Sequence, residues 1–197
     1  DALINVDLKT REPKSRKKKL KIIRIGTSGS LQENVPLGSH LISDYAVGLD
    51  NLMNFYDLEM TAFEEAIAKD IQKKTSISFS PYLVRCSALL KSQFGPDMII
   101  GNTITAPGFY APQGREIRIP LKYPKLLEEL SRYYHKASNL RLTNFEMETA
   151  GYYAMARLLG HEALSVNAII ANRALNKFSK DPNKVVDSLI KKVLERI

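Results

Sequence analysis

The chain has 197 residues, 44% of them hydrophobic, and a formal net charge of +8, so it can bury a large core and an anionic partner must be considered. No stretch approaches the ~20 consecutive apolar residues of a membrane span, and residues 1–10 lack the pattern of a secretory signal. One cysteine, Cys86, and three scattered histidines exclude an internal disulfide and a cysteine- or histidine-rich metal site, and they suit a reducing compartment, which we expect to be the cytoplasm.

Two segments of alternating polarity flank a basic run near the N-terminus. Ala2–Lys9 and Leu20–Ile25 predict strands, and the run Lys14–Lys21 joins them, with Lys or Arg at positions 14, 16, 17, 18, 19 and 21. Such a run favours a solvated hairpin turn, with a nuclear-localisation or nucleic-acid patch as the alternative. Because the rest of the chain is only mildly basic, we expect no nucleic-acid partner.

The middle of the chain predicts a helix, three strands and a long loop. Thr61 and Glu64 form a capping box, in which each side chain satisfies a backbone amide at the start of a helix. The predicted strands are His40–Leu49, Tyr82–Ala88 and Met98–Thr105. Residues 106–122 contain three prolines and two glycines, so we expect a loop, and loops of this length inside compact domains are commonly functional.

The last third of the chain continues the alternation. Helices are predicted from Pro124 to Tyr134, from Met147 to Leu159 before Gly160, and from Asp181-Pro182 onward; strands are predicted at Thr143–Glu146 and Ala163–Asn172. Strands that alternate with helices predict a single α/β domain over residues 1–197, with a central mixed sheet flanked by helices.

Polar residues gather in three segments that follow predicted strands, where ligands of α/β sheets tend to bind. Arg24–Gly29 (Arg-Ile-Gly-Thr-Ser-Gly) offers phosphate a guanidinium, two hydroxyls and backbone amides that glycine leaves free; the alternative is an ordinary tight turn. The segment lacks Gly-Lys-Thr/Ser and is therefore not a Walker motif.

The other two segments suit a heterocycle and a sugar. Phe109–Arg115 (Phe-Tyr-Ala-Pro-Gln-Gly-Arg) holds an aromatic ring, an amide and a guanidinium, and the alternative is a proline-rich surface loop. In Asn144–Glu148, Glu146 and Glu148 point to the same side if the segment is extended, and their carboxylates can then accept hydrogen bonds from the vicinal hydroxyls of a sugar. The alternative there is that acidic residues complement the dipole of a first helical turn.

Taken together, Arg24–Gly29, Phe109–Arg115 and Asn144–Thr149 resemble, in order and spacing, the nucleoside phosphorylase-I superfamily and within it the uridine phosphorylases. The resemblance extends through Ala168–Arg173 to the final helix. It implies a phosphorylase/hydrolase-like fold with a partly barrel-like sheet. It also implies a pentosyltransferase of nucleoside catabolism and pyrimidine salvage that cleaves uridine to uracil and ribose 1-phosphate, with no cofactor, no metal and inorganic phosphate as co-substrate.

The resemblance implies a role for each matching residue. Phosphate is expected at Arg24 and Thr27, and the base at Phe109, Gln113 and Arg115. Ribose is expected at Thr27, Glu146, Met147 and Glu148, with Glu146 supporting the others. Ser28 and Gly29 are expected to line the site.

A missing acid favours a pyrimidine substrate. Purine-cleaving relatives share an aspartate that protonates N7 of the leaving purine, and the matching stretch Ala168–Arg173 contains no Asp. The alternatives are a purine or broad-specificity phosphorylase, and an inactive relative that binds nucleosides without cleaving them.

The family's pattern begins before Asp1. Its first strand, with a glycine and an arginine for phosphate, has no counterpart here, nor have the histidine and arginine that reach into a neighbouring subunit's site. We therefore expect the N-terminal part of the domain to be missing from this chain. The resemblance also implies a homo-oligomer, a dimer or a ring of dimers.

Overall fold

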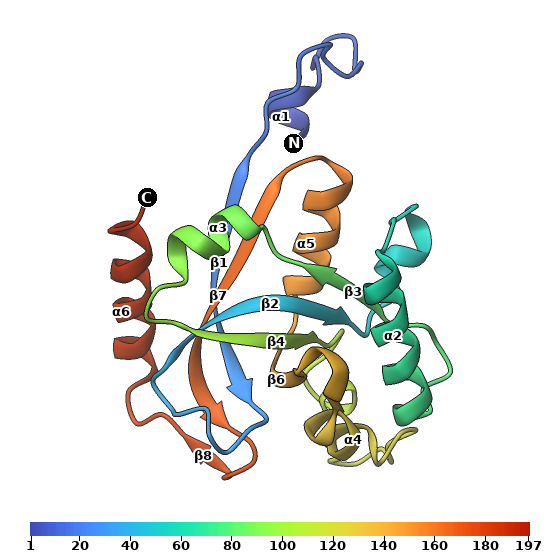
Figure 1. The fold of residues 1–197 in the computed structure, drawn as a ribbon, viewed down its shortest axis with the longest axis vertical. Helices are drawn as coiled ribbons and strands as arrows, with labels where there is room; N and C mark the ends of the chain where they lie inside the picture. Colours follow the sequence, from blue (N-terminus) through green and yellow to red (C-terminus); the bar gives the residue numbers. More distant parts are fainter.

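The computed structural model describes residues 1–197 and places most strands in one mixed sheet that closes on itself. The strands are β1 (Lys21–Ser30), β2 (His40–Gly48), β3 (Tyr82–Arg85), β4 (Ile99–Thr105), β5 (Tyr134–His135), β6 (Leu140–Glu146), β7 (Glu162–Asn172) and β8 (Lys177–Phe178). The order β1–β7–β2–β4–β6 returns to β1, which is parallel to β7 and antiparallel to β6. The expected α/β fold with a mixed, barrel-like sheet is confirmed, and Figure 1 shows β1 and β7 running side by side.

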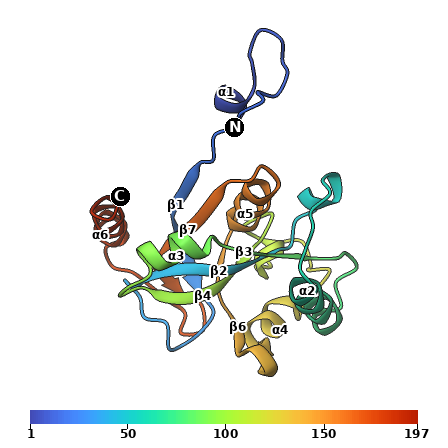
Figure 2. The same ribbon diagram turned by 45° about the horizontal axis from the view of Figure 1, so that its top comes forward.

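Helices cover the outside of the closed sheet. They are α2 (Ala62–Thr75), α3 (Ala88–Phe94), α4 (Leu126–Arg132), α5 (Thr149–Leu158) and α6 (Pro182–Leu194). A short helix, α1 (Ala2–Asn5), lies before β1 and away from the sheet, and the 3₁₀ turns are η1 (Leu52–Phe55), η2 (Ala111–Gln113) and η3 (Lys136–Ser138). α6 packs on β1 and β7, whereas α2 and α4 pack on each other at the opposite side (Figures 1 and 2). No helix is both long and apolar enough to cross a membrane.

The buried residues form two hydrophobic clusters with a group of polar side chains between them. One hydrophobic cluster forms where α3, α5 and α6 meet the strands, and it includes Leu90 and Val166. A second forms around α2 and α4, and it includes Ile67 and Ile104. Between them lie fully buried polar side chains, among them Ser43, Thr103, Asn144 and Asn167. Buried polar groups need hydrogen-bond partners, and these residues supply them to one another.

The predicted signals at helix ends are confirmed. The Thr61 hydroxyl accepts a hydrogen bond from the Glu64 amide at 3.2 Å, and the Glu64 carboxylate accepts one from the Thr61 amide at 2.9 Å. Asp181 caps α6 by accepting from the Lys184 amide at 3.0 Å. Gly160 follows α5 with a φ of 72°, in the left-handed region that favours glycine after a helix.

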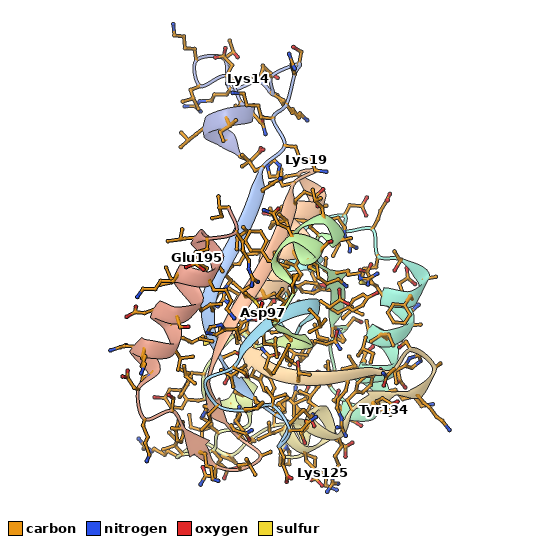
Figure 3. All side chains as sticks on the ribbon, turned by 60° about the vertical axis from the view of Figure 1, so that its left-hand side comes forward. Lys14, Lys19, Asp97, Lys125, Tyr134 and Glu195 are labelled. Carbon is orange, nitrogen blue, oxygen red and sulfur yellow. The ribbon has the colours of Figure 1, made fainter.

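The segment before β1 differs from the expected hairpin. Ala2–Asn5 forms the helical turn α1, and the only strand-like pairing is a bridge between Val6 and Pro13. Residues 1–20 project from the body as an arm, with Lys14 near its far end and Lys19 at its base (Figure 3). The strand prediction is wrong because the arm lies beyond the end of the sheet, where no strand edge is available to it.

Further boundaries differ from the prediction, and the strand expected at Thr143–Glu146 begins at Leu140. The strand expected at Tyr82–Ala88 ends at Arg85, because the Ser87 hydroxyl accepts from the Leu90 amide at 3.2 Å and begins α3. The helix expected to reach Tyr134 ends at Arg132, and β5 then pairs with β6.

Candidate active site

One cleft of about 630 Å³ gathers the three polar segments. It lies where β1, β6 and β7 meet the loop that follows β4, so residues far apart in sequence become neighbours. All ten residues expected at the site line this cleft: Arg24, Thr27, Ser28, Gly29, Phe109, Gln113, Arg115, Glu146, Met147 and Glu148.

The segment Arg24–Gly29 lies within β1 and is not a turn. It pairs with β7 along its length, with a bulge between Ser28 and Gly29. The backbone of the segment is that of a strand, and its glycine at position 26 matters because it has no side chain. A Cβ on Gly26 would lie 2.3 Å from the nearest guanidinium nitrogen of Arg24. Glycine at this position therefore leaves the space in which the Arg24 side chain lies across its own strand.

Four polar side chains surround the Arg24 guanidinium. Nη1 donates to Oδ1 of Asn167 at 3.1 Å and to Oγ of Ser165 at 3.3 Å. Nη2 donates to the Glu148 carboxylate and lies 3.3 Å from an oxygen of Glu146. The side chain is 16% exposed, so its charge faces the cleft from a largely buried and well-oriented position.

The two carboxylates have different surroundings. Glu146 is 1% exposed, and it accepts hydrogen bonds from the Thr105 hydroxyl (2.6 Å) and from the amides of Glu148 and Thr149 (2.9 Å each). Glu148 is 48% exposed, and its side chain contacts only Arg24. The oxygens of Glu146 are therefore used by hydrogen bonds within the protein, whereas the oxygens of Glu148 can still accept hydrogen bonds from a ligand.

The loop after β4 forms the opposite wall. Arg115 Nη1 donates to the Phe109 carbonyl at 2.6 Å and to Oε1 of Gln113 at 2.7 Å, and the guanidinium lies 3.8 Å from the centroid of the Phe109 ring. Since Oε1 of Gln113 accepts from Arg115, the amide nitrogen of this buried side chain is left to donate. Burial lowers the pKa of Arg115, and no carboxylate pairs with it.

Arg173 enters the same cleft, and sequence reasoning did not predict a role for it. Its Nη2 donates to the Gln113 carbonyl at 2.6 Å, whereas its Nη1 is buried without any partner. Burial and the nearby charge of Arg115 lower the pKa of Arg173 to about 10, so it stays positive at neutral pH. One signal could have indicated it: Asn172-Arg173 is a polar pair at the end of the apolar strand β7.

The cleft therefore has three chemically distinct regions. The loop wall offers donors and an aromatic face, Glu148 offers an acceptor near the middle, and Arg24 offers a cation beside the exposed Thr27 hydroxyl. The remaining lining residues are Leu127, Phe145, Ile170, Ala171, Asn172, Asn176 and Phe178. Such an arrangement suits a ligand made of a planar polar ring, a hydroxylated linker and an anion.

Comparison with known proteins gives one consistent result. A family model described as "Phosphorylase superfamily" matches residues 18–196. The uridine phosphorylase of Thermococcus kodakarensis is 29% identical over 162 residues, which are 82% of this chain and 52% of that protein. Mouse uridine phosphorylase 1 is 28% identical over an alignment length of 189, and the alignment covers 89% of this chain and 56% of that protein. The chain thus spans about half the length of these curated relatives.

Solved structures have the same fold. A Trypanosoma brucei nucleoside phosphorylase, whose description states uridine phosphorylase activity, superposes with a TM-score of 0.86 at 24% identity, over 99% of this chain and 72% of that one. Uridine phosphorylase from Schistosoma mansoni superposes with a TM-score of 0.56 at 24% identity, over 91% of this chain and 60% of that one. At these sequence identities, the superpositions show a shared fold and nothing about substrate.

Proposed function

The chain belongs to the phosphorylase superfamily, and we propose that it cleaves uridine with inorganic phosphate to give uracil and ribose 1-phosphate. The observation that carries this proposal is the wall formed by Gln113, Arg115 and Arg173, which presents hydrogen-bond donors without a carboxylic acid. A leaving uracil gains negative charge on its carbonyl oxygens and needs such donors. A leaving purine is helped by an acid at N7, and the only carboxylates lining the cleft, Glu146 and Glu148, contact Arg24.

In this proposal each region binds one part of the substrates. Phe109 packs against the nucleoside while Gln113 and Arg115 donate to the uracil edge. Glu148 accepts from the ribose hydroxyls, and Met147 packs under the sugar. Arg24 and Thr27 bind phosphate, which takes the place of Glu148 on the Arg24 guanidinium.

The reaction then needs no covalent intermediate with the protein. A phosphate oxygen forms a bond to C1′ as the bond from C1′ to N1 of uracil breaks, and the electron pair of that bond leaves with the base. The protein holds the dianion in line with C1′ and stabilises the negative charge that develops on uracil. In this proposal Arg115 donates to that charge, and the positive charge of Arg173 in the same cleft adds to its stabilisation.

Ultraviolet absorbance tests this proposal. We expect purified chain to consume uridine only when phosphate is present, and to leave inosine unchanged. Cleavage of inosine would support a purine or broad-specificity phosphorylase instead. Binding of uridine without phosphate-dependent loss would support an inactive nucleoside-binding protein.

We also propose that the chain works as a homo-oligomer. Apolar side chains beside the cleft are exposed: Leu52 and Phe55 on η1, and Tyr152 on α5. A second copy covering this face would bury them and close the adjoining cleft. Light scattering is expected to give at least a dimer for the parent chain and a monomer for Phe55→Asp. A monomeric parent would contradict this proposal.

A further inference from the structure

A belt of polar side chains runs around the inside of the closed sheet. It takes one residue from each of five strands and then returns to β1: Arg24, Asn167, Ser43, Thr103, Asn144 and Ser28. It begins where Nη1 of Arg24 donates to Oδ1 of Asn167 at 3.1 Å. Nδ2 of Asn167 then donates to Oγ of Ser43 at 3.1 Å.

The second half of the belt returns to the cleft. The hydroxyls of Ser43 and Thr103 are hydrogen-bonded to each other, and Thr103 donates to Oδ1 of Asn144 at 3.0 Å. Nδ2 of Asn144 donates to Oγ of Ser28 at 3.0 Å, and Ser28 lines the cleft. Four of these side chains are 0% exposed and Ser28 is 5% exposed, so water does not compete for the bonds.

Along the belt from Arg24 to Ser28, each side chain donates a hydrogen bond to the next one, and the chemistry of the groups explains this order. A guanidinium has donors and no acceptor, so the Asn167 atom that faces Arg24 must be the oxygen. The amide nitrogen must then face Ser43, whose oxygen accepts. Because Thr103 uses its hydrogen on Asn144, Ser43 donates to Thr103. Ser43, which does not touch Arg24, thus supplies the nearer of two acceptors for the Asn167 amide nitrogen, the other being Ser165 at 3.5 Å, and so helps to orient the amide.

We propose that Asn167, with its amide oriented by Ser43, is a positioning residue for the phosphate-binding arginine. Arg24 lies over the space left by Gly26, and the groups that accept from Nη1 there are the side chains of Asn167 and Ser165, so we expect its orientation to depend on them. Glu148 is half exposed and is required for ribose in the proposed function, on which this inference rests. Asn167 and Ser165 remain as the buried acceptors that hold Nη1 throughout the reaction.

Nuclear magnetic resonance of the Arg24 guanidinium tests the inference without reference to activity. The signal is assigned by its loss in Arg24→Lys. We expect slow rotation of the guanidinium in the parent, fast rotation in Ser43→Ala and Asn167→Ala, and slow rotation again in Asn167→Asp, which keeps the acceptor. Unchanged slow rotation in both alanine variants would overturn the inference.

Phosphate affinity, measured by calorimetry on the same proteins, gives a second readout. Ser43→Ala and Asn167→Ala are expected to weaken phosphate binding about tenfold, the size expected for a hydrogen bond to a charged group. The control is Gln32→Ala, which removes a buried amide with two hydrogen bonds outside the cleft; it should lower Tm and leave phosphate affinity within about twofold.

The two readouts separate this inference from the proposed function. Parental phosphate affinity in Ser43→Ala, with Tm lowered as in Gln32→Ala, would show that the belt only stabilises the fold and would overturn the inference. A parent chain that neither binds phosphate nor cleaves uridine would contradict the proposed function, and the rotation of the Arg24 guanidinium would still decide the role of Asn167.

Discussion

Glu146 and Glu148 are two residues apart, and the structure gives them separate tasks. Glu146 is buried at the end of β6, where it accepts from the amides that begin α5. Glu148 is half exposed and faces the cleft beside Arg24. The sequence predicts both as sugar-binding acids, because their side chains have the same chemistry. Their difference arises from burial, which depends on β4 and α5 packing around Glu146.

This difference predicts opposite effects of two matched substitutions. Glu148→Ala should raise KM for uridine about tenfold, because a charged acceptor for the ribose hydroxyls is lost, and it should leave Tm nearly unchanged. The increase should be smaller for 2′-deoxyuridine. Glu146→Ala should lower the free energy of unfolding by about 3 kcal/mol, because three buried donors lose their acceptor. Steady-state kinetics measure KM, and thermal denaturation measures the stability of both variants. An unchanged KM in Glu148→Ala would contradict the assignment.

Gly26 provides a second test at a single position. In Gly26→Ala the new methyl group occupies the place of the Arg24 guanidinium, which is the movable end of a flexible side chain. We expect KM for phosphate to rise about tenfold, as a charged contact is displaced, with Tm within a few degrees of the parent. Arg24→Ala should raise KM for phosphate at least as much, and the double variant that combines Gly26→Ala with Arg24→Ala should have the same KM as Arg24→Ala alone. Additive effects would mean that Gly26 acts independently of Arg24.

Arg115 is the residue with the largest expected effect on turnover. Arg115→Ala removes a donor to the leaving base, so kcat for uridine should fall about 100-fold. The fold should persist, because the residue lies in a loop and contributes little to either hydrophobic cluster. Arg118→Ala is the matched control, since Arg118 is an exposed arginine of the same loop outside the cleft. Equal kinetics in the two variants would contradict the role of Arg115.

At the residue scale, sequence reasoning found the segments and missed their long-range partners. Arg24, Gln113 and Glu148 stand in short polar motifs next to apolar strands, which made them candidates, and the resemblance of three such motifs in order to one family selected them over ordinary turns and loops. Arg173 and Asn167 lie at the end of or within the apolar strand β7, and their importance depends on contacts with β1 and the loop after β4. Such contacts cannot be derived from the local pattern of one strand.

At the scale of elements, Glu64 joins three of them. Its carboxylate caps α2 through Thr61, accepts from the Arg85 amide of β3 at 3.1 Å, and pairs with both terminal nitrogens of Arg157 on α5 at 2.7 and 2.8 Å. Burial favours the neutral acid, but the Arg157 hydrogen bonds and the Thr61 amide outweigh it and hold the pKa of Glu64 below its ordinary value of 4.5. The capping box predicted from sequence is therefore also a tertiary junction.

The lowered pKa gives a pH prediction with a definite sign. Because the folded pKa lies below the unfolded value of 4.5, the stabilisation is complete above 4.5 and is lost as pH falls through the folded pKa. Glu64→Gln should cost about 2 kcal/mol of unfolding free energy at pH 7 and a smaller amount at pH 3. Urea denaturation at both pH values measures this. An equal cost at the two values would contradict the ion pair.

The elements that sequence reasoning predicted are those with strong internal signals. The strand ends at β2 and β4 and the caps of α2 and α6 agree with the prediction to within one or two residues. α3, β5 and β8 were not predicted, because they are short and depend on neighbours: β5 and β8 exist as pairs with β6 and β7. The alternation in residues 2–8 predicts a strand, but a strand also needs a partner, and the arm has none.

At the scale of the whole molecule, closure of the sheet creates the site. β1 contributes Arg24 to the cleft, the end of β6 contributes Glu146 and the start of α5 contributes Glu148; β1 and β6 are adjacent because the sheet returns on itself. The resemblance to the phosphorylase superfamily and the mixed, barrel-like sheet are confirmed. Uridine as the substrate, the oligomer and the cytoplasmic location stay predictions.

Phosphorus-31 nuclear magnetic resonance of a reaction mixture tests the central claim most directly, because phosphorolysis transfers the phosphate itself. With uridine and inorganic phosphate, we expect the phosphate signal to decrease as a sugar 1-phosphate ester signal grows in equal amount, and no ester to form with inosine. Release of uracil with the phosphate signal unchanged would mean hydrolysis, and it would contradict the proposed transfer to C1′ as well as the role of Arg24.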